Sequence, residues 1–147
     1  MIYALYEGLR LVLAEGLEER FDRHRYHETA LVAGLVAMGL NLFGDEEHKL
    51  PCVTCIEIPS GVDGESVRKM LLDAFSIEIA SSFGPLHGKI WRIGTMGYSC
   101  RKENILAVLG ALEAVLIRHG VNVNRGQALQ AALDVYAVEN NHLLALK

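Results

Sequence analysis

The chain has 147 residues, with 14 Lys and Arg against 18 Asp and Glu, so its formal charge is −4 at pH 7. This length is typical of one domain, and a pI near 5.8 excludes the basic surface that nucleic acid or an anionic membrane requires. The chain is 51% hydrophobic and only 22% charged, which predicts that part of its surface faces another domain or subunit.

The N-terminus lacks the features of a leader sequence, because no basic segment precedes Glu7 and Arg10. The longest uncharged stretch, from Thr29 to Gly44, is shorter than the ~20 apolar residues that span a bilayer. Three cysteines, an odd number, do not form a disulfide framework and fit a reducing compartment. We therefore expect a cytoplasmic protein with no membrane partner.

The chain begins inside a helical pattern whose apolar residues share one face: Ile2, Leu5, Leu9, Val12, Leu13 and Leu17. Because no capping residue precedes this pattern, we expect Met1 to be an internal methionine of a longer protein or a truncated start. The polar run 18–25 either continues the helix or bends it. A second apolar face then follows at Leu31, Leu35 and Met38, and Gly39 is expected to end that helix.

Four extended segments are predicted between turn residues, at 42–43, 52–58, 77–79 and 89–96. Asp63 is the expected N-cap of a helix between the second and third of these segments. The residues that this helix should bury are Val67, Met70, Leu71 and Ala74.

Two further helices are predicted after the last strand. Ser99 should cap the first, which carries Ile105, Leu109, Leu112 and Leu116 at helical spacing and ends near Arg118 and Gly120. A linker, 121–125, precedes the second, whose apolar face holds Leu129, Ala132, Leu133 and Tyr136 and which should fray at Asn140 and Asn141. This order favours an α+β fold, a small, mostly antiparallel sheet covered by helices.

Two groups of residues have the spacing of metal or redox sites. Cys52 and Cys55 form a CxxC pattern, but residues three apart in a strand point to opposite faces, so we expect two inert cysteines. His24, His27 and Glu28 could share a helix face and hold a metal, yet no further ligands accompany them. In so charged a segment a solvated helix surface is the stronger interpretation, and we predict no metal site.

The segment 84–89 resembles a phosphate-binding loop only at first sight. It has one residue too few between its glycines, places Ile90 where Ser or Thr would hold Mg²⁺, and leads into a strand instead of a helix.

Arg92 is the main candidate for a binding residue. Period-two alternation places it between apolar neighbours on one face of the strand 89–96, where a charge needs an anionic partner. Its planar guanidinium matches a carboxylate in two-point contact. The partner is either an Asp or Glu of the protein, which residue spacing alone favours, or a ligand, which the nearby Gly94 and Gly97 favour.

The run Ser82-Phe83-Gly84-Pro85-Leu86-His87-Gly88-Lys89-Ile90-Trp91-Arg92-Ile93-Gly94-Thr95-Met96-Gly97-Tyr98 carries a resemblance to a known family. It resembles the C-terminal domain of class V (fold type I) pyridoxal-phosphate aminotransferases of the alanine–glyoxylate type. It is most similar to the (S)-ureidoglycine–glyoxylate branch of purine catabolism. Supporting segments are 5–10, 23–25, 37–40, 53–59 and 101–104.

The resemblance implies that Arg92 binds the substrate α-carboxylate of both the amino donor and glyoxylate. It also implies that pyridoxal phosphate and its catalytic lysine belong to a large domain absent here, since none of the five lysines has a matching context: Lys49, Lys69, Lys89, Lys102 and Lys147. No catalytic or cofactor-binding residue is therefore expected. The partners implied are this large domain and the second subunit of a homodimer.

Three segments are expected on this basis. Residues 1–20 form a helix leading in from the large domain, 21–120 a small substrate-binding α+β domain, and 121–147 a linker, helix and tail. An alternative of another class is a stand-alone α+β ligand-sensing or interaction module.

Overall fold

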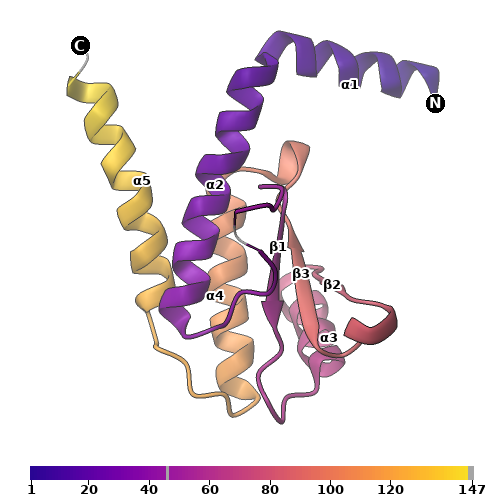
Figure 1. Cartoon of the computed structure of the whole chain (residues 1–147), viewed down its shortest axis with the longest axis vertical. Helices are drawn as coiled ribbons and strands as arrows, with labels where there is room; N and C mark the ends of the chain where they lie inside the picture. Colours follow the sequence, from indigo (N-terminus) through magenta and orange to yellow (C-terminus); the bar gives the residue numbers. More distant parts are fainter. Residues whose placement is uncertain (46, 146–147) are drawn as a thin grey trace.

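The computed structural model describes residues 1–45 and 47–145, with side chains described up to residue 138. Figure 1 shows α-helices packed beside a small sheet. In chain order the elements are α1 (Ile2–Glu15), α2 (Leu17–Met38), β1 (Val53–Glu57), α3 (Gly64–Phe75), β2 (Ala80–Ser81), η1 (Gly84–Leu86), β3 (Ile90–Gly94), η2 (Gly97–Ser99), α4 (Lys102–Arg118) and α5 (Gln127–Ala145).

The sheet has the order β1-β3-β2, and both pairs of strands are antiparallel. Cys55 of β1 and Ala80 of β2 both lie opposite Arg92, so Arg92 occupies the central strand. A small antiparallel sheet with helices confirms the α+β prediction.

One face of the sheet packs against the helices. Thr54 and Ile56 of β1 and Trp91 and Ile93 of β3 are buried there. The Trp91 indole N–H donates to the Gly64 carbonyl at the start of α3, 3.2 Å away. The apolar faces of α2, α3 and α4 complete this core with Leu31, Leu35, Val67, Leu71, Leu109 and Leu112. This burial confirms the predicted faces of α2 and α4.

The predicted N-cap of α3 and the predicted end of α2 are confirmed. The Asp63 carboxylate accepts the Glu65 N–H at 3.1 Å and caps α3. Gly39 adopts the left-handed conformation, with φ of 95°, at the end of α2. Within α3, however, Ala74 is exposed and Met70 is only half-buried, so the buried face of this helix is narrower than predicted.

Two of the predicted extended segments differ from the structure. Residues 77–79 do not form a strand, because Ser76 ends α3 at positive φ and only Ala80 and Ser81 reach the edge of β3. The segment 42–43 makes a single bridge, between Leu42 and Ile56.

Ser99 does not cap α4, since it ends the short η2 turn and Arg101 occupies the cap position. Downstream, α5 is confirmed but continues to Ala145, past the predicted fraying at Asn140 and Asn141, and Leu133 on its expected apolar face is exposed.

The first two helices meet at a sharp bend, which Figure 1 shows at the top of α2. The bend is at Gly16, with φ of 90° and ψ of 146°, and not in the polar run 18–25, which continues α2. This conformation favours glycine because it lies at positive φ. Leu17, predicted within the first helix, begins the second.

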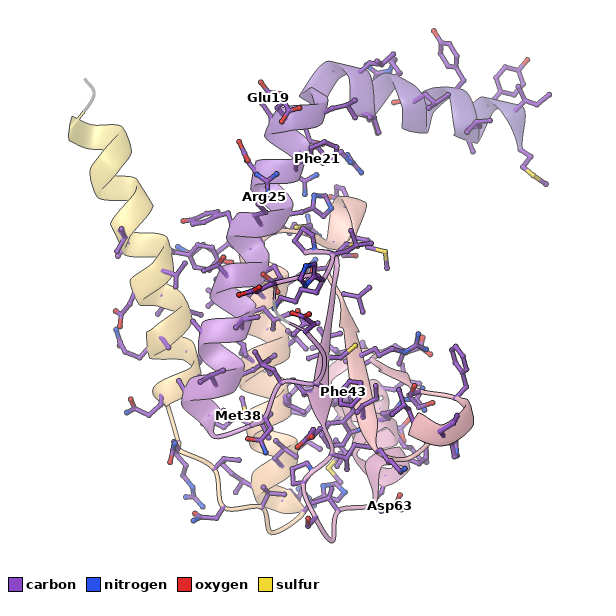
Figure 2. All side chains as sticks on the ribbon, in the orientation of Figure 1. Glu19, Phe21, Arg25, Met38, Phe43 and Asp63 are labelled. Carbon is purple, nitrogen blue, oxygen red and sulfur yellow. The ribbon has the colours of Figure 1, made fainter. Side chains whose placement is uncertain are left out.

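Helix α1 contributes nothing to the core. Its described residues include none that is buried, and Ile2 and Leu13 keep 82% and 80% of their surface exposed. In Figure 2 its side chains project from the helix on several sides. This exposure agrees with the expectation, drawn from composition, of a surface that faces another domain or subunit.

Candidate functional site

The second face of the sheet carries Arg92 and is largely free of the helical core. Antiparallel partners point to the same side, so Arg92 shares this face with Cys55 and Ala80. Glu57, Ala80 and Gly94 on this face are exposed, Cys55 and Arg92 are half-buried, and Ile90 at one end of it is buried. The strand alternation therefore directs the guanidinium away from the core, with Gly94 leaving the backbone open beside it.

Arg92 is held by a backbone carbonyl and an aromatic ring. Its Nε and Nη2 donate to the Ser81 carbonyl oxygen at 3.0 and 2.8 Å. The guanidinium carbon lies 5.5 Å from the centre of the Phe83 ring, within cation–π range. Ser81 of β2 lies opposite Trp91 of β3. The pairing of these two strands therefore also places the Ser81 carbonyl next to Arg92.

The ion pairs of the described residues do not include Arg92, so the structure provides no Asp or Glu partner for it. Its Nη1 also has no hydrogen-bond acceptor among them. The Ser81 carbonyl occupies the Nε side of the guanidinium, while the outer Nη1 and Nη2 hydrogens can still receive one carboxylate. The salt bridge that residue spacing favoured was therefore the wrong alternative for the described part of the chain.

The sequence singled out Arg92 but missed the two residues that orient it. Ser81 contacts Arg92 through its backbone carbonyl, and because every residue has this group the sequence does not mark it. Phe83, 76% exposed, does have a signal in the sequence, because it is a large apolar side chain next to a Gly/Pro loop.

Cys52 and Cys55 are free thiols in the structure, and Cys52 precedes β1. Cys55 faces the Arg92 side of the sheet as its register partner. Their inertness stays a prediction. Among residues 1–45 and 47–138, whose side chains the structure describes, no group of three or more His, Cys, Asp or Glu could hold a metal ion.

The interpretation of His24, His27 and Glu28 as a solvated surface was wrong. His27 and Glu28 are buried, because α5 packs along α2 and the loop before β1 returns over it. The His27 ring nitrogen Nδ1 lies 2.9 Å from the Tyr136 hydroxyl of α5, and Glu28 pairs with Lys49 at 2.6 Å. Burial raises the pKa of the Tyr136 hydroxyl, which keeps it protonated.

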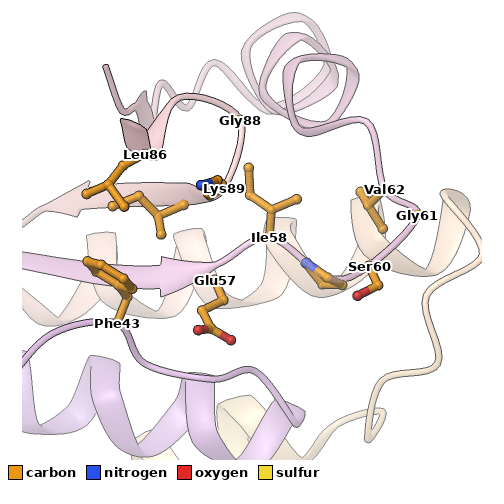
Figure 3. A pocket seen from close by; sticks show the side chains of 11 residues that line it. Phe43, Glu57, Ile58, Ser60, Gly61, Val62, Leu86, Gly88 and Lys89 are labelled. Carbon is orange, nitrogen blue, oxygen red and sulfur yellow. The ribbon is translucent and has the colours of Figure 1, made fainter. Parts of the chain in front are cut away.

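The described lysines do not gather around Arg92. Lys49 pairs with Glu28, Lys69 pairs with Asp73 at 2.5 Å, and Lys102 lies 5.0 Å from the centre of the Tyr136 ring. Lys89 lines a cavity of about 340 Å³ beside Phe43 and Glu57, which Figure 3 shows between the end of β1 and the start of β3. Lys147 lies outside the described residues. These contacts do not form a site that fits pyridoxal phosphate.

A second polar cluster, missed by the sequence analysis, lies at the α1–α2 bend. The Glu15 carboxylate accepts hydrogen bonds from Arg23 Nε at 2.5 Å and from Arg20 Nη1 at 2.7 Å, both across Gly16. These two guanidinium groups, Arg23 first, lower the pKa of Glu15 from its ordinary 4.5 to about 2. The cluster therefore stays charged in the neutral range and fixes the bend of an otherwise unpacked helix.

We expect the Glu15 cluster to make the free energy of unfolding depend on pH in the acidic range. The folded pKa of Glu15 lies below its ordinary value, so its contribution is fully present above pH 4.5 and is lost as the pH falls to about 2. Urea unfolding at stepped pH should show the wild type losing more stability over this range than Glu15→Gln, with the two converging near pH 2. Glu18→Gln, which removes a carboxylate of the same turn, should follow the wild type. Parallel curves for wild type and Glu15→Gln would contradict the assignment.

No helix of the described residues is long and apolar enough to cross a membrane. No family model matches the chain. Over 136 residues it is 73% identical to the (S)-ureidoglycine–glyoxylate transaminase of Bacillus subtilis strain 168, which covers 92% of this chain and 33% of that protein. It is 40% identical over 116 residues to the alanine–glyoxylate aminotransferase of Callithrix jacchus, which covers 78% of this chain and 28% of that protein.

A solved structure agrees with these sequence matches. The ureidoglycine–glyoxylate aminotransferase of Bacillus subtilis superposes with a TM-score of 0.90 at 72% identity, over 92% of this chain and 35% of that one. The chain thus spans about a third of the length of the curated relatives it matches. It belongs to the ureidoglycine–glyoxylate and alanine–glyoxylate aminotransferase family and corresponds to the C-terminal part of its members.

Proposed function

We propose that this chain is the substrate-carboxylate-binding domain of a pyridoxal-phosphate-dependent aminotransferase that transfers an amino group to glyoxylate in the cytoplasm. The observation that carries the proposal is Arg92, which is oriented by Ser81 and Phe83, has no carboxylate partner among the described residues and stands on an open sheet face. Ureidoglycine is the proposed donor, because the relative named for it is 73% identical against 40% for an alanine-dependent one.

Arg92 serves both halves of such a reaction, since the donor amino acid and glyoxylate each carry a carboxylate next to the reacting carbon. Binding that carboxylate at two points fixes the orientation of the neighbouring carbon. The cofactor, when bound, supplies the electron-withdrawing group that makes transfer possible. We propose that a preceding large domain and the second subunit of a homodimer hold it, because the lysines described here are engaged elsewhere or lie apart from Arg92.

The proposal is tested by comparing the complete gene product with the 147-residue chain. The complete protein should form glycine from glyoxylate with ureidoglycine, or with alanine or serine, as donor. The chain alone should form none, and borohydride treatment in the presence of pyridoxal phosphate should leave no pyridoxyl group on a specific lysine. An inactive complete protein would favour the alternative of a ligand-sensing module, and a stoichiometrically labelled lysine in the chain alone would contradict the division of roles.

A further inference from the structure

We infer that Arg23 and His24, with Glu15 holding Arg23 in place, are positioning residues for the turn that follows the Arg92 strand. We call these three residues the Gly97 clamp. The inference rests on the proposed function, because it concerns how the open sheet face around Arg92 is shaped.

The Gly97 clamp holds both backbone groups of one residue. Gly97 lies three positions beyond β3 with φ of 57°, a conformation that favours glycine. Its N–H donates to Nε2 of His24 at 3.2 Å, and its carbonyl accepts from Nη1 of Arg23 at 3.1 Å. The same Nη1 donates to the Cys100 carbonyl at 2.7 Å, so Arg23 also ties down the far end of η2.

Each side chain of the clamp is itself fixed. His24 Nδ1 lies 2.7 Å from the Arg20 carbonyl, to which it donates, so Nε2 is left as the acceptor that Gly97 requires. Arg23 directs its Nε, at 2.5 Å, and its Nη2, at 3.1 Å, to the Glu15 carboxylate. One guanidinium therefore links the end of α1 to the turn after β3, two segments far apart in the sequence.

The clamped turn borders the face that carries Arg92. The last strand-like hydrogen bond of this chain segment runs from the Thr95 N–H to the Cys52 carbonyl at 2.9 Å, so the sheet does not hold the residues beyond it. Met96 follows, 55% exposed, and a β-carbon on Gly94 would lie 3.3 Å from its methyl group. Gly94 is two residues from Arg92 on the same face, so a shift of Gly97 would move the Met96 side chain on the face that carries Arg92.

A positioning role predicts a specific pattern among variants. Arg23→Met and His24→Leu should speed hydrogen exchange of the Gly97 amide at least 10-fold in the 147-residue chain. In the complete enzyme they should raise KM for glyoxylate roughly 3- to 30-fold with kcat nearly unchanged. His24→Gln, whose amide oxygen can accept the Gly97 N–H, should restore most of both properties. Arg25→Met should change neither, because the Arg25 side chain is exposed and forms its ion pair with Asp22 of the same helix.

Exchange of the Gly97 amide at the wild-type rate in both variants would overturn the inference, as would faster exchange with an unchanged KM. Failure of His24→Gln to recover either property would also overturn it. These readouts separate the clamp from the proposed function, because amide exchange needs no catalysis and the function itself is tested through Arg92.

Discussion

Under the proposed function, replacing Arg92 by alanine in the complete protein should lower kcat/KM for glyoxylate and for the amino donor by more than roughly 100-fold. Charge-assisted hydrogen bonds contribute about 1.5–3 kcal/mol each, and alanine removes both that would reach a carboxylate. Arg92→Lys keeps the charge but loses the planar two-point contact, so a loss of roughly 10- to 100-fold is expected. Steady-state kinetics of both half-reactions measures these effects.

Arg68 offers a matched control for this experiment. Like Arg92, it donates its Nε to a backbone carbonyl near β2, that of Ile79 at 2.7 Å, but it also pairs with Glu65. Arg68→Ala therefore removes a similar structural contact and should leave kcat/KM near the wild-type value. The cofactor absorbance should be unchanged in both variants. Wild-type kcat/KM in Arg92→Ala would mean that Arg92 only supports the sheet and that the carboxylate site lies elsewhere.

Gly34→Ala should destabilise the chain by about 1–3 kcal/mol, although alanine is the better helix former by about 1 kcal/mol. Gly34 is buried in α2, where a β-carbon would lie 2.5 Å from Leu109 of α4 and 2.9 Å from the backbone carbonyl of Ala128 in α5. A backbone atom cannot move aside as the end of a side chain can, so α2 and α5 would have to separate. Urea unfolding of the 147-residue chain measures the change.

Gly110→Ala in α4 is the control, because its nearest neighbour would be a Leu129 methyl carbon at 3.9 Å, an ordinary contact. There the gain in helix propensity should prevail and stabilise the chain by about 0.5–1 kcal/mol. If both alanines stabilised the protein, the close approach of α2 and α5 at Gly34 would be disproved.

The residues that sequence analysis placed correctly are those whose signals act over one or two turns of chain. The apolar face of α4, the Asp63 cap and the end of α2 at Gly39 each depend on neighbours within a few positions. Arg92 is also identified by a local feature, because it is a charged residue in a strand of mostly apolar residues. Its proposed role in binding a substrate carboxylate comes from the family resemblance, because residue spacing alone favours a salt bridge within the protein.

Tertiary structure decided what depends on residues distant in the sequence. His27 and Glu28 carry the pattern of a solvated face, but both are buried, with the Tyr136 hydroxyl 2.9 Å from His27 and Lys49 in an ion pair with Glu28. Arg92 finds the Ser81 carbonyl only because β2 pairs at the edge of β3. The bend at Gly16 likewise depends on a positive φ and on an ionic cluster that joins Glu15 of α1 to Arg23 of α2. Local propensity cannot reveal such contacts, because each of them exists only once separate elements have packed together.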